Sequence, residues 1–151
     1  MSARSVAIAA ARRVVIKLGT RVLTDDGGAL ALGRLNEVVA VAAGLHGRQR
    51  EVLLVTSGAV GLGREALGIP TPTELPLRQA CAAVGQSRLM QLYSEACARH
   101  GVVCAQVLLA QADFADRNRY LNLRTTLETL LEHRALPIVN ENDVVSTEEL
   151  D

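Results

Sequence analysis

The chain has 151 residues, of which 49% are hydrophobic, and its 16 Lys and Arg residues balance 16 Asp and Glu residues. Such a chain can bury one core and fold as a single domain. The balanced charge gives no field that favours nucleic acid or an anionic membrane surface, and no apolar run reaches the roughly 18 residues of a membrane span. We therefore expect a soluble, cytoplasmic protein that binds neither nucleic acid nor membranes.

The first predicted element is a strand that ends at a lysine and a glycine. Residues 13–20 read RVVIKLGT, and this β-branched run without polar alternation predicts a parallel strand covered on both faces. An ammonium group at its end needs an anionic partner. Gly19 permits a positive φ and a tight turn, which would present Thr20 and backbone N–H groups to a phosphate. The alternative is that Lys17 lies at an exposed strand end and reaches water.

Strands and helices then alternate along the chain. The predicted elements are a turn at 25–28, a helix over 35–45, a strand at 52–56, a short helix at 59–67 broken by Gly61 and Gly63, an irregular proline-rich loop at 68–76, a helix over 77–100, a strand at 102–109, a helix capped by Asp116, and a strand at 136–139. This order predicts an α/β fold, a three-layer sandwich whose mainly parallel sheet has helices on both faces.

The cysteines and histidines do not predict a metal site. Cys81, Cys97 and Cys104 lie in apolar surroundings without Cys-x-x-Cys spacing, which is typical of reduced core residues. Each of the three histidines falls near the end of a predicted helix, where the ring usually faces solvent or the helix dipole.

Three predicted strands are followed by small or polar residues, at 17–20, 56–59 and 140–143. The carboxyl ends of parallel strands meet at one edge of a sheet, where ligands gather. A lysine, a serine hydroxyl, glycine-backed N–H groups and a carboxylate suit a phosphate together with a small zwitterion. In this interpretation Lys17 neutralises phosphate oxygens and Asp143 binds an ammonium group.

Each of these features also has a simpler explanation. Ser57 can be a helix cap, and Asp143 an ordinary turn carboxylate. The arginines after Asp116 are better explained as a solvated helix face than as an anion site; they are Arg117, Arg119 and Arg124. The chain has neither Gly-x-x-x-x-Gly-Lys-Ser/Thr nor Gly-x-Gly-x-x-Gly after a strand, so a kinase interpretation cannot depend on those motifs.

Five motifs in this order resemble the glutamate 5-kinase branch of the amino acid kinase family, and the similar kinase half of pyrroline-5-carboxylate synthase. They are VIKLGT at 15–20, VTSGAV at 55–60, GRE at 63–65, AAVGQSRL at 82–89 and IVNEND at 138–143. The first motif is shared by the wider family. The Ser-Gly-Ala, Ala-Val-Gly-Gln and Asn-Glu-Asn-Asp blocks are specific to this branch.

The resemblance implies an enzyme that uses ATP and Mg²⁺ to phosphorylate the side-chain carboxylate of L-glutamate, the first step of proline biosynthesis. It assigns catalysis to Lys17, which contacts the ATP phosphates together with Gly19 and Thr20. The residues that it assigns to glutamate are Ser57, Gly58, Ala59, Asn140 and Asp143. It further implies a homo-oligomer and feedback inhibition by proline.

The resemblance also divides the chain. Residues 1–12 are an N-terminal extension, and residues 13–151 correspond to the N-terminal, glutamate-binding part of the kinase domain. Because family members continue into a nucleotide-binding part that this sequence lacks, we expect the 151-residue chain to be a truncated, catalytically incomplete form. The alternative is a non-catalytic module that binds glutamate or proline or takes part in assembly.

Overall fold

A computed structural model describes residues 10–23 and 31–146, so the turn predicted at 25–28 lies outside the described residues. The elements in chain order are β1 (Arg13–Lys17), α2 (Thr20–Leu23), α3 (Leu32–Gly47), β2 (Glu51–Val55), α4 (Ala59–Leu67), α5 (Leu75–Ala98), β3 (Cys104–Leu109), α6 (Ala112–Ala115), α7 (Arg117–Glu132) and β4 (Leu136–Glu141). The long predicted helices and all of the predicted strands are therefore confirmed, and α2 and α6 were not predicted.

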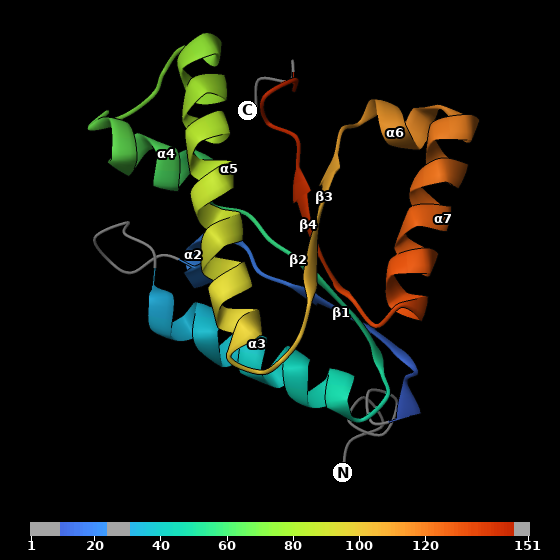
Figure 1. The fold of residues 1–151 in the computed structure, drawn as a ribbon. Helices are drawn as coiled ribbons and strands as arrows, with labels where there is room; N and C mark the ends of the chain where they lie inside the picture. The colour runs from blue at the N-terminus through green and yellow to red at the C-terminus, as the bar shows by residue number, and fades with distance from the viewer. Residues whose placement is uncertain (1–9, 24–30, 147–151) are drawn as a thin grey trace.

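The four strands form one parallel sheet in the order β1-β2-β4-β3. Figure 1 shows α3 and α5 on one face of this sheet and α7 on the other. The connections from β1 to β2 and from β2 to β3 run in the same direction across the sheet, which places α3 and α5 on the same face. The connection from β3 to β4 runs in the opposite direction and places α7 on the other face, as right-handed crossovers require. The predicted three-layer α/β fold is confirmed.

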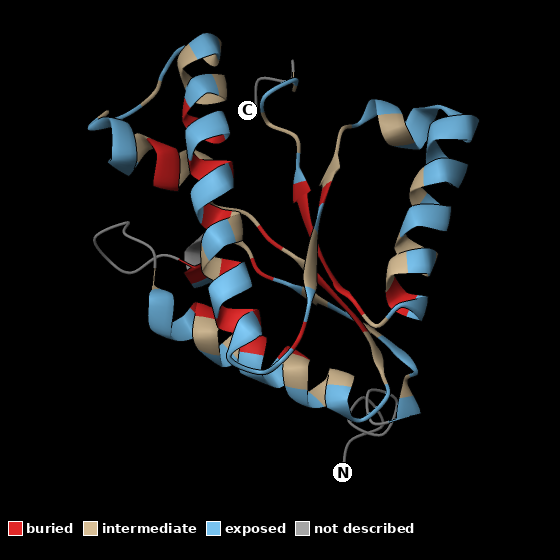
Figure 2. Ribbon diagram, in the orientation of Figure 1, coloured by how far each residue is buried: buried red, intermediate tan, exposed pale blue. Residues whose placement is uncertain are grey.

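The core lies between the sheet and the layer formed by α3 and α5. Leu54, Leu89 and Tyr93 are fully buried there, as is Ile138 on β4. In Figure 2 the buried residues gather on the inner faces of α3 and α5 and along the strands, whereas most of α7 is exposed. Cys81 and Cys97 are buried, as predicted, and Cys104 is half-buried.

Strand β1 lies at the edge of the sheet and is covered on one face only. Ile16 packs against the core, whereas Val15, which points to the other face, is 59% exposed. Helix α7 contacts β4 and leaves this part of the sheet open. The prediction that both faces are covered is wrong, because a β-branched run does not specify how far from the edge a strand will lie.

Two predicted interruptions also differ from the structure. Helix α4 runs without a break through Gly61 and Gly63. Pro76, assigned from the sequence to the irregular loop, is the second residue of α5, where its fixed φ suits the first helical turn and its missing N–H is not needed. Asp116 caps α7 as predicted, since its Oδ1 accepts a hydrogen bond of 2.8 Å from the Arg119 amide.

Helices α4 and α5 touch backbone to backbone. A Cβ atom added to Gly63 would lie 1.7 Å from the carbonyl oxygen of Cys81, and one added to Gly85 would lie 1.7 Å from that of Ala59. Only glycine leaves room for this approach. The contact fixes the first turn of α4 against the middle of α5.

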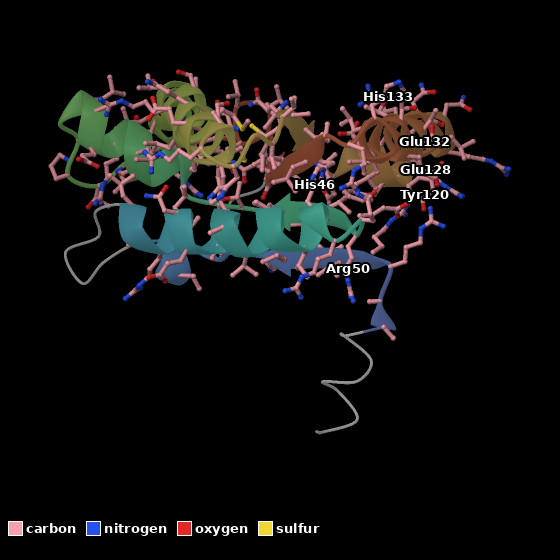
Figure 3. All side chains as sticks on the ribbon, turned by 60° about the horizontal axis from the view of Figure 1, so that its bottom comes forward. His46, Arg50, Tyr120, Glu128, Glu132 and His133 are labelled. Atoms are coloured by element: carbon pink, nitrogen blue, oxygen red, sulfur yellow. The ribbon has the colours of Figure 1, made fainter. Side chains whose placement is uncertain are left out.

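At the opposite end of the sheet, the C-terminal ends of α3 and α7 are tied together. The Nε2 atom of His46 donates to the carbonyl oxygen of Arg134 at 2.9 Å, and the guanidinium of Arg134 donates to the carbonyl oxygens of His46 and Arg50. Figure 3 looks onto this end of the molecule, with His46, Arg50 and His133 labelled. These bonds hold the two outer layers around the amino ends of the strands.

None of the helices in residues 10–23 and 31–146 combines the length and apolar character that crossing a bilayer requires.

Candidate functional site

A cavity of about 450 Å³ lies at the carboxyl ends of β1, β2 and β4. The register explains why these ends meet: Lys17 lies opposite Val55, and Val55 lies opposite Val139. The predicted site residues that line the cavity are Lys17, Ser57, Gly58, Asn140 and Asp143. The structure therefore brings together the three segments that follow the predicted strands.

Two of the predicted residues that the structure describes, Gly19 and Ala59, do not line this cavity. Gly19 lies just beyond β1, and its carbonyl oxygen accepts a hydrogen bond of 2.9 Å from the Val22 amide at the start of α2. It does not adopt the positive φ that glycine permits, and the chain turns directly into α2. The backbone of Thr20 begins α2, but its side chain lies outside the described residues. Ala59 is buried, with 2% of its surface exposed, so only its backbone could serve a ligand.

Lys17 is the last residue of β1, and its side chain is exposed at the cavity. Among the described residues it forms no salt bridge. The two explanations of Lys17, exposure to water at a strand end and binding of an anion, are therefore compatible. The ammonium group can reach both water and an anion in the cavity.

Ser57 and Gly58 connect β2 to α4. The Ser57 hydroxyl donates to the carbonyl oxygen of Leu18 at 3.0 Å, which ties the ends of β2 and β1 together. It does not cap α4, so that alternative is wrong. Gly58 is the N-cap, with a φ of 107° that favours glycine, and no described side chain caps this helix.

The uncapped end of α4 faces the cavity. Val60 and Gly61, in the first turn of the helix, both line it. Backbone N–H groups in a first turn have no partner within the helix, and the helix dipole adds partial positive charge there. This end of α4 can therefore hold a carboxylate or a phosphate.

Asn140 lies within β4 and not in the turn that follows it. It is 4% exposed, and its Nδ2 atom donates to Oε1 of Gln86 on α5 at 2.8 Å. A comparable buried contact is made by Thr56, the residue after β2, whose Oγ1 lies 2.8 Å from the hydroxyl of Tyr93 on α5. Burial raises the pKa of Tyr93 to about 12, so this phenol stays protonated at neutral pH.

Asp143 follows β4 and is half-buried at the cavity. Burial raises the pKa of this carboxyl, and the nearby Glu141 carboxylate raises it further, whereas the Arg78 guanidinium acts in the opposite direction. The negative charges of Asp143 and Glu141 repel each other, and a cationic ligand between them would reduce this repulsion. The cavity therefore has a place for an ammonium group.

Arg78 was not predicted from the sequence as a site residue. It lies in the first turn of α5 and lines the cavity from a segment far along the chain from Lys17. A cation in the first turn of a helix opposes the helix dipole, and this was the one signal that could have identified it. With Arg78 included, the described residues give the cavity two cations and two carboxylates, together with the backbone N–H groups of α4. This combination suits a zwitterion that carries an extra acidic group.

Comparisons with known proteins agree with this geometry. The amino acid kinase family model matches residues 12–150. The glutamate 5-kinase of Trichlorobacter lovleyi is 54% identical over 140 residues, which are 92% of this chain and 37% of that protein. The glutamate 5-kinases of Myxococcus xanthus and Chromohalobacter salexigens are each 48% identical, with 95% and 99% of this chain covered. The resemblance to glutamate 5-kinase is confirmed.

The chain spans only 37–40% of the length of these relatives. Among solved structures, the UMP kinase of Ureaplasma parvum matches with a TM-score of 0.57 and 13% identity, over 85% of this chain and 55% of that one. A likeness at this level of identity shows the fold. The parallel sheet, the family match over residues 12–150 and the similarity to known kinases lead to one conclusion: this chain belongs to the amino acid kinase family.

Proposed function

We propose that this chain is the amino-acid-binding part of a glutamate 5-kinase, in which the γ-phosphoryl group of ATP is transferred to the side-chain carboxylate of L-glutamate. The observation that carries the proposal is the convergence of Lys17, the N-terminal end of α4 and Asp143 on one cavity of about 450 Å³. Relatives named glutamate 5-kinase, 54% and 48% identical to this chain, support the choice of substrate.

Each group of a bound glutamate has a counterpart in the cavity. Asp143 binds the α-ammonium group. The first amides of α4 hold a carboxylate, Ser57 joins them when its hydroxyl turns from the Leu18 carbonyl towards the ligand, and Arg78 neutralises the charge of the carboxylate. Lys17 lies where charge develops on the transferring phosphoryl group and stabilises the transition state electrostatically. Positioning and charge stabilisation are the main contributions that a protein makes to this kind of transfer.

The cofactors belong to the same proposal. The exposed, cationic Lys17 fits the phosphates of ATP, and Gly19 and Thr20 would lie beside them. In the described residues there is no cluster of three or more His, Cys, Asp or Glu side chains that could hold a metal. Because Mg²⁺ is usually held by one or two carboxylates and by substrate phosphates, we propose that it enters with ATP.

The remaining expectations are also proposals. Residues 13–151 would be the glutamate-binding part of the kinase domain, and residues 1–12 an extension. Proline would compete with glutamate for the cavity, and the chain would assemble as a homo-oligomer in the cytoplasm.

Isothermal titration calorimetry of the 151-residue chain tests the substrate. We expect saturable binding of L-glutamate, weaker binding of L-aspartate, and none of D-glutamate, because the ammonium and carboxylate positions are set by groups on different elements. Binding of proline alone would support the non-catalytic module. Absence of any heat with L-glutamate would contradict the proposal.

Asp143→Asn should weaken L-glutamate binding about tenfold or more, because a charge-assisted hydrogen bond to the ammonium group is lost. Because the pKa of Asp143 is raised, the folded state holds this proton more tightly than the unfolded chain does. As the pH rises above the ordinary pKa of an aspartate, ionisation of Asp143 therefore makes folding less favourable. The variant should therefore be more stable than the wild type at neutral pH in urea unfolding.

Ionisation of the Asp143 carboxyl should also make L-glutamate binding depend on pH. Affinity of the wild-type chain for L-glutamate should fall as the pH is lowered through the raised pKa of Asp143, and binding in that range should release protons. Calorimetry in two buffers of different ionisation enthalpy measures the release. The Asp143→Asn variant should show a flatter profile, and an unchanged profile would remove Asp143 from the site.

Arg78→Met should also weaken binding of L-glutamate, by about tenfold, because the carboxylate loses a cationic partner while the length of the side chain is kept. Arg88→Met is the matched control on the same helix, since Arg88 lines a different hollow of the surface. Calorimetry that finds equal affinities for the two variants would exclude a role of Arg78 in binding.

A further inference from the structure

A polar pair buried between α5 and β4 lies directly behind the candidate site. Gln86 is 9% exposed and Asn140 is 4% exposed, and the Nδ2 atom of Asn140 donates to Oε1 of Gln86 at 2.8 Å. Asn140 lines the cavity, whereas Gln86 belongs to the face of α5 that packs on the sheet. The pair joins residues 54 positions apart in the sequence.

Gln86 is costly to the fold. Its neighbours on the inner face of α5 are apolar, among them Ala82 and Leu89, and its own Nε2 atom is buried without a hydrogen-bond partner among the described residues. A buried donor without a partner loses its hydration and gains nothing in return. An apolar side chain would fill the same position without burying an unpartnered amide, so packing alone does not explain a glutamine here.

The geometry of the bond supplies a reason. A carboxamide is planar, so a hydrogen bond that holds one N–H of Asn140 also sets the direction of its second N–H and of its Oδ1 atom. Those two groups are the ones that Asn140 can offer to a ligand in the cavity. The position of Gln86 is set in turn by Gly85, whose contact with the Ala59 carbonyl fixes α5 against the first turn of α4.

We infer that Gln86 is a positioning residue of the amino acid site, which holds the Asn140 carboxamide in the orientation that binds the substrate. The inference rests on the proposed function and extends it from the cavity wall to the helix behind it.

A double-mutant cycle on the 151-residue chain tests this role, with L-glutamate as the probe in calorimetry and urea unfolding as the measure of stability. The variants are Gln86→Met, Asn140→Ala and the combination of both. Gln86→Met alone should weaken binding about tenfold, the equivalent of one lost hydrogen bond. In the Asn140→Ala background the same change should alter affinity by less than about twofold, because its effect is exerted through Asn140.

Two measurements separate positioning from a purely structural role. Gln91→Met, on the exposed side of α5, is the matched control and should leave affinity unchanged. In ¹⁵N-labelled protein, the side-chain NH₂ resonances of Gln86 should shift when L-glutamate is added, and those of Gln91 should not.

The possible results decide between the two ideas. If the wild-type chain binds no L-glutamate, both the proposed function and this inference fail. The inference alone is overturned if the wild type binds L-glutamate and Gln86→Met binds it equally well. It is also overturned if Gln86→Met weakens binding by the same factor in the Asn140→Ala background as in the wild type.

Discussion

Gly85→Ala should destabilise the chain by at least about 3 kcal/mol, which is a large part of the 5–15 kcal/mol typical of a domain. The added Cβ would lie 1.7 Å from the carbonyl oxygen of Ala59 and 2.5 Å from the amide nitrogen of Gly63. Both atoms belong to the backbone, so no rotamer change can relieve the clash. Helices α4 and α5 would have to separate, and the buried surface between them would open.

Urea unfolding followed by circular dichroism measures this effect. Gly63→Ala should behave alike, because its Cβ would lie 1.7 Å from the carbonyl oxygen of Cys81. Gly44→Ala is the control: it lies inside α3 with nothing within 4 Å of the added atom, and the change should stabilise the chain by up to about 1 kcal/mol. A Gly85→Ala variant as stable as the wild type would mean that the two helices do not approach this closely.

The contact has consequences for the site as well. The first turn of α4 carries the amides proposed to hold a carboxylate, and α5 carries Arg78 and Gln86. Glycines at the crossing therefore set the distance between two walls of the cavity. Gly63→Ala is therefore expected to reduce glutamate affinity along with stability.

Lys17→Ala should reduce phosphoryl transfer by about 100-fold or more, with little change in the KM for glutamate, because its charge acts mainly in the transition state. The chain spans 37% of the Trichlorobacter lovleyi glutamate 5-kinase, so the test uses a chimera in which residues 12–151 replace the matching part of that enzyme. Glutamyl hydroxamate formation, with ATP, Mg²⁺ and hydroxylamine present, reports the acyl phosphate product.

Arg13→Ala is the matched control for this experiment. Arg13 lies on the same strand and the same face as Lys17, but at the other end, where it pairs with Glu51 at 2.7 Å. Its removal should leave kcat within about twofold, since exposed ion pairs contribute little. An unchanged kcat in the Lys17→Ala chimera would exclude the lysine from catalysis. The unfused 151-residue chain should form little hydroxamate.

Much of the fold could be predicted because its signals are local. A helix begins where Asp116 can accept a hydrogen bond from an amide three residues on, and this cap formed as expected. The apolar run of residues 52–55 became the interior strand β2. The three segments that follow the strands met at one edge, since parallel strands in a single sheet all end on the same side.

The sequence was less informative where an outcome depends on distant partners. The same kind of apolar run produced both the interior strand β2 and the half-exposed edge strand β1, because lateral order in a sheet is decided by which strands pair. Gly61 and Gly63 suggested a broken helix, since the sequence does not show that α5 packs against one of them.

The sequence by itself determined the order of the strands and the longer helices, the ends of most of those helices and the motifs that identify the family, because each depends on residues that are neighbours along the chain. The tertiary structure alone decided the edge position of β1, the place of Arg78 in the cavity and the pairing of Gln86 with Asn140. These features arise from packing between segments far apart in sequence, where the free energy of one residue depends on a partner that local patterns do not reveal.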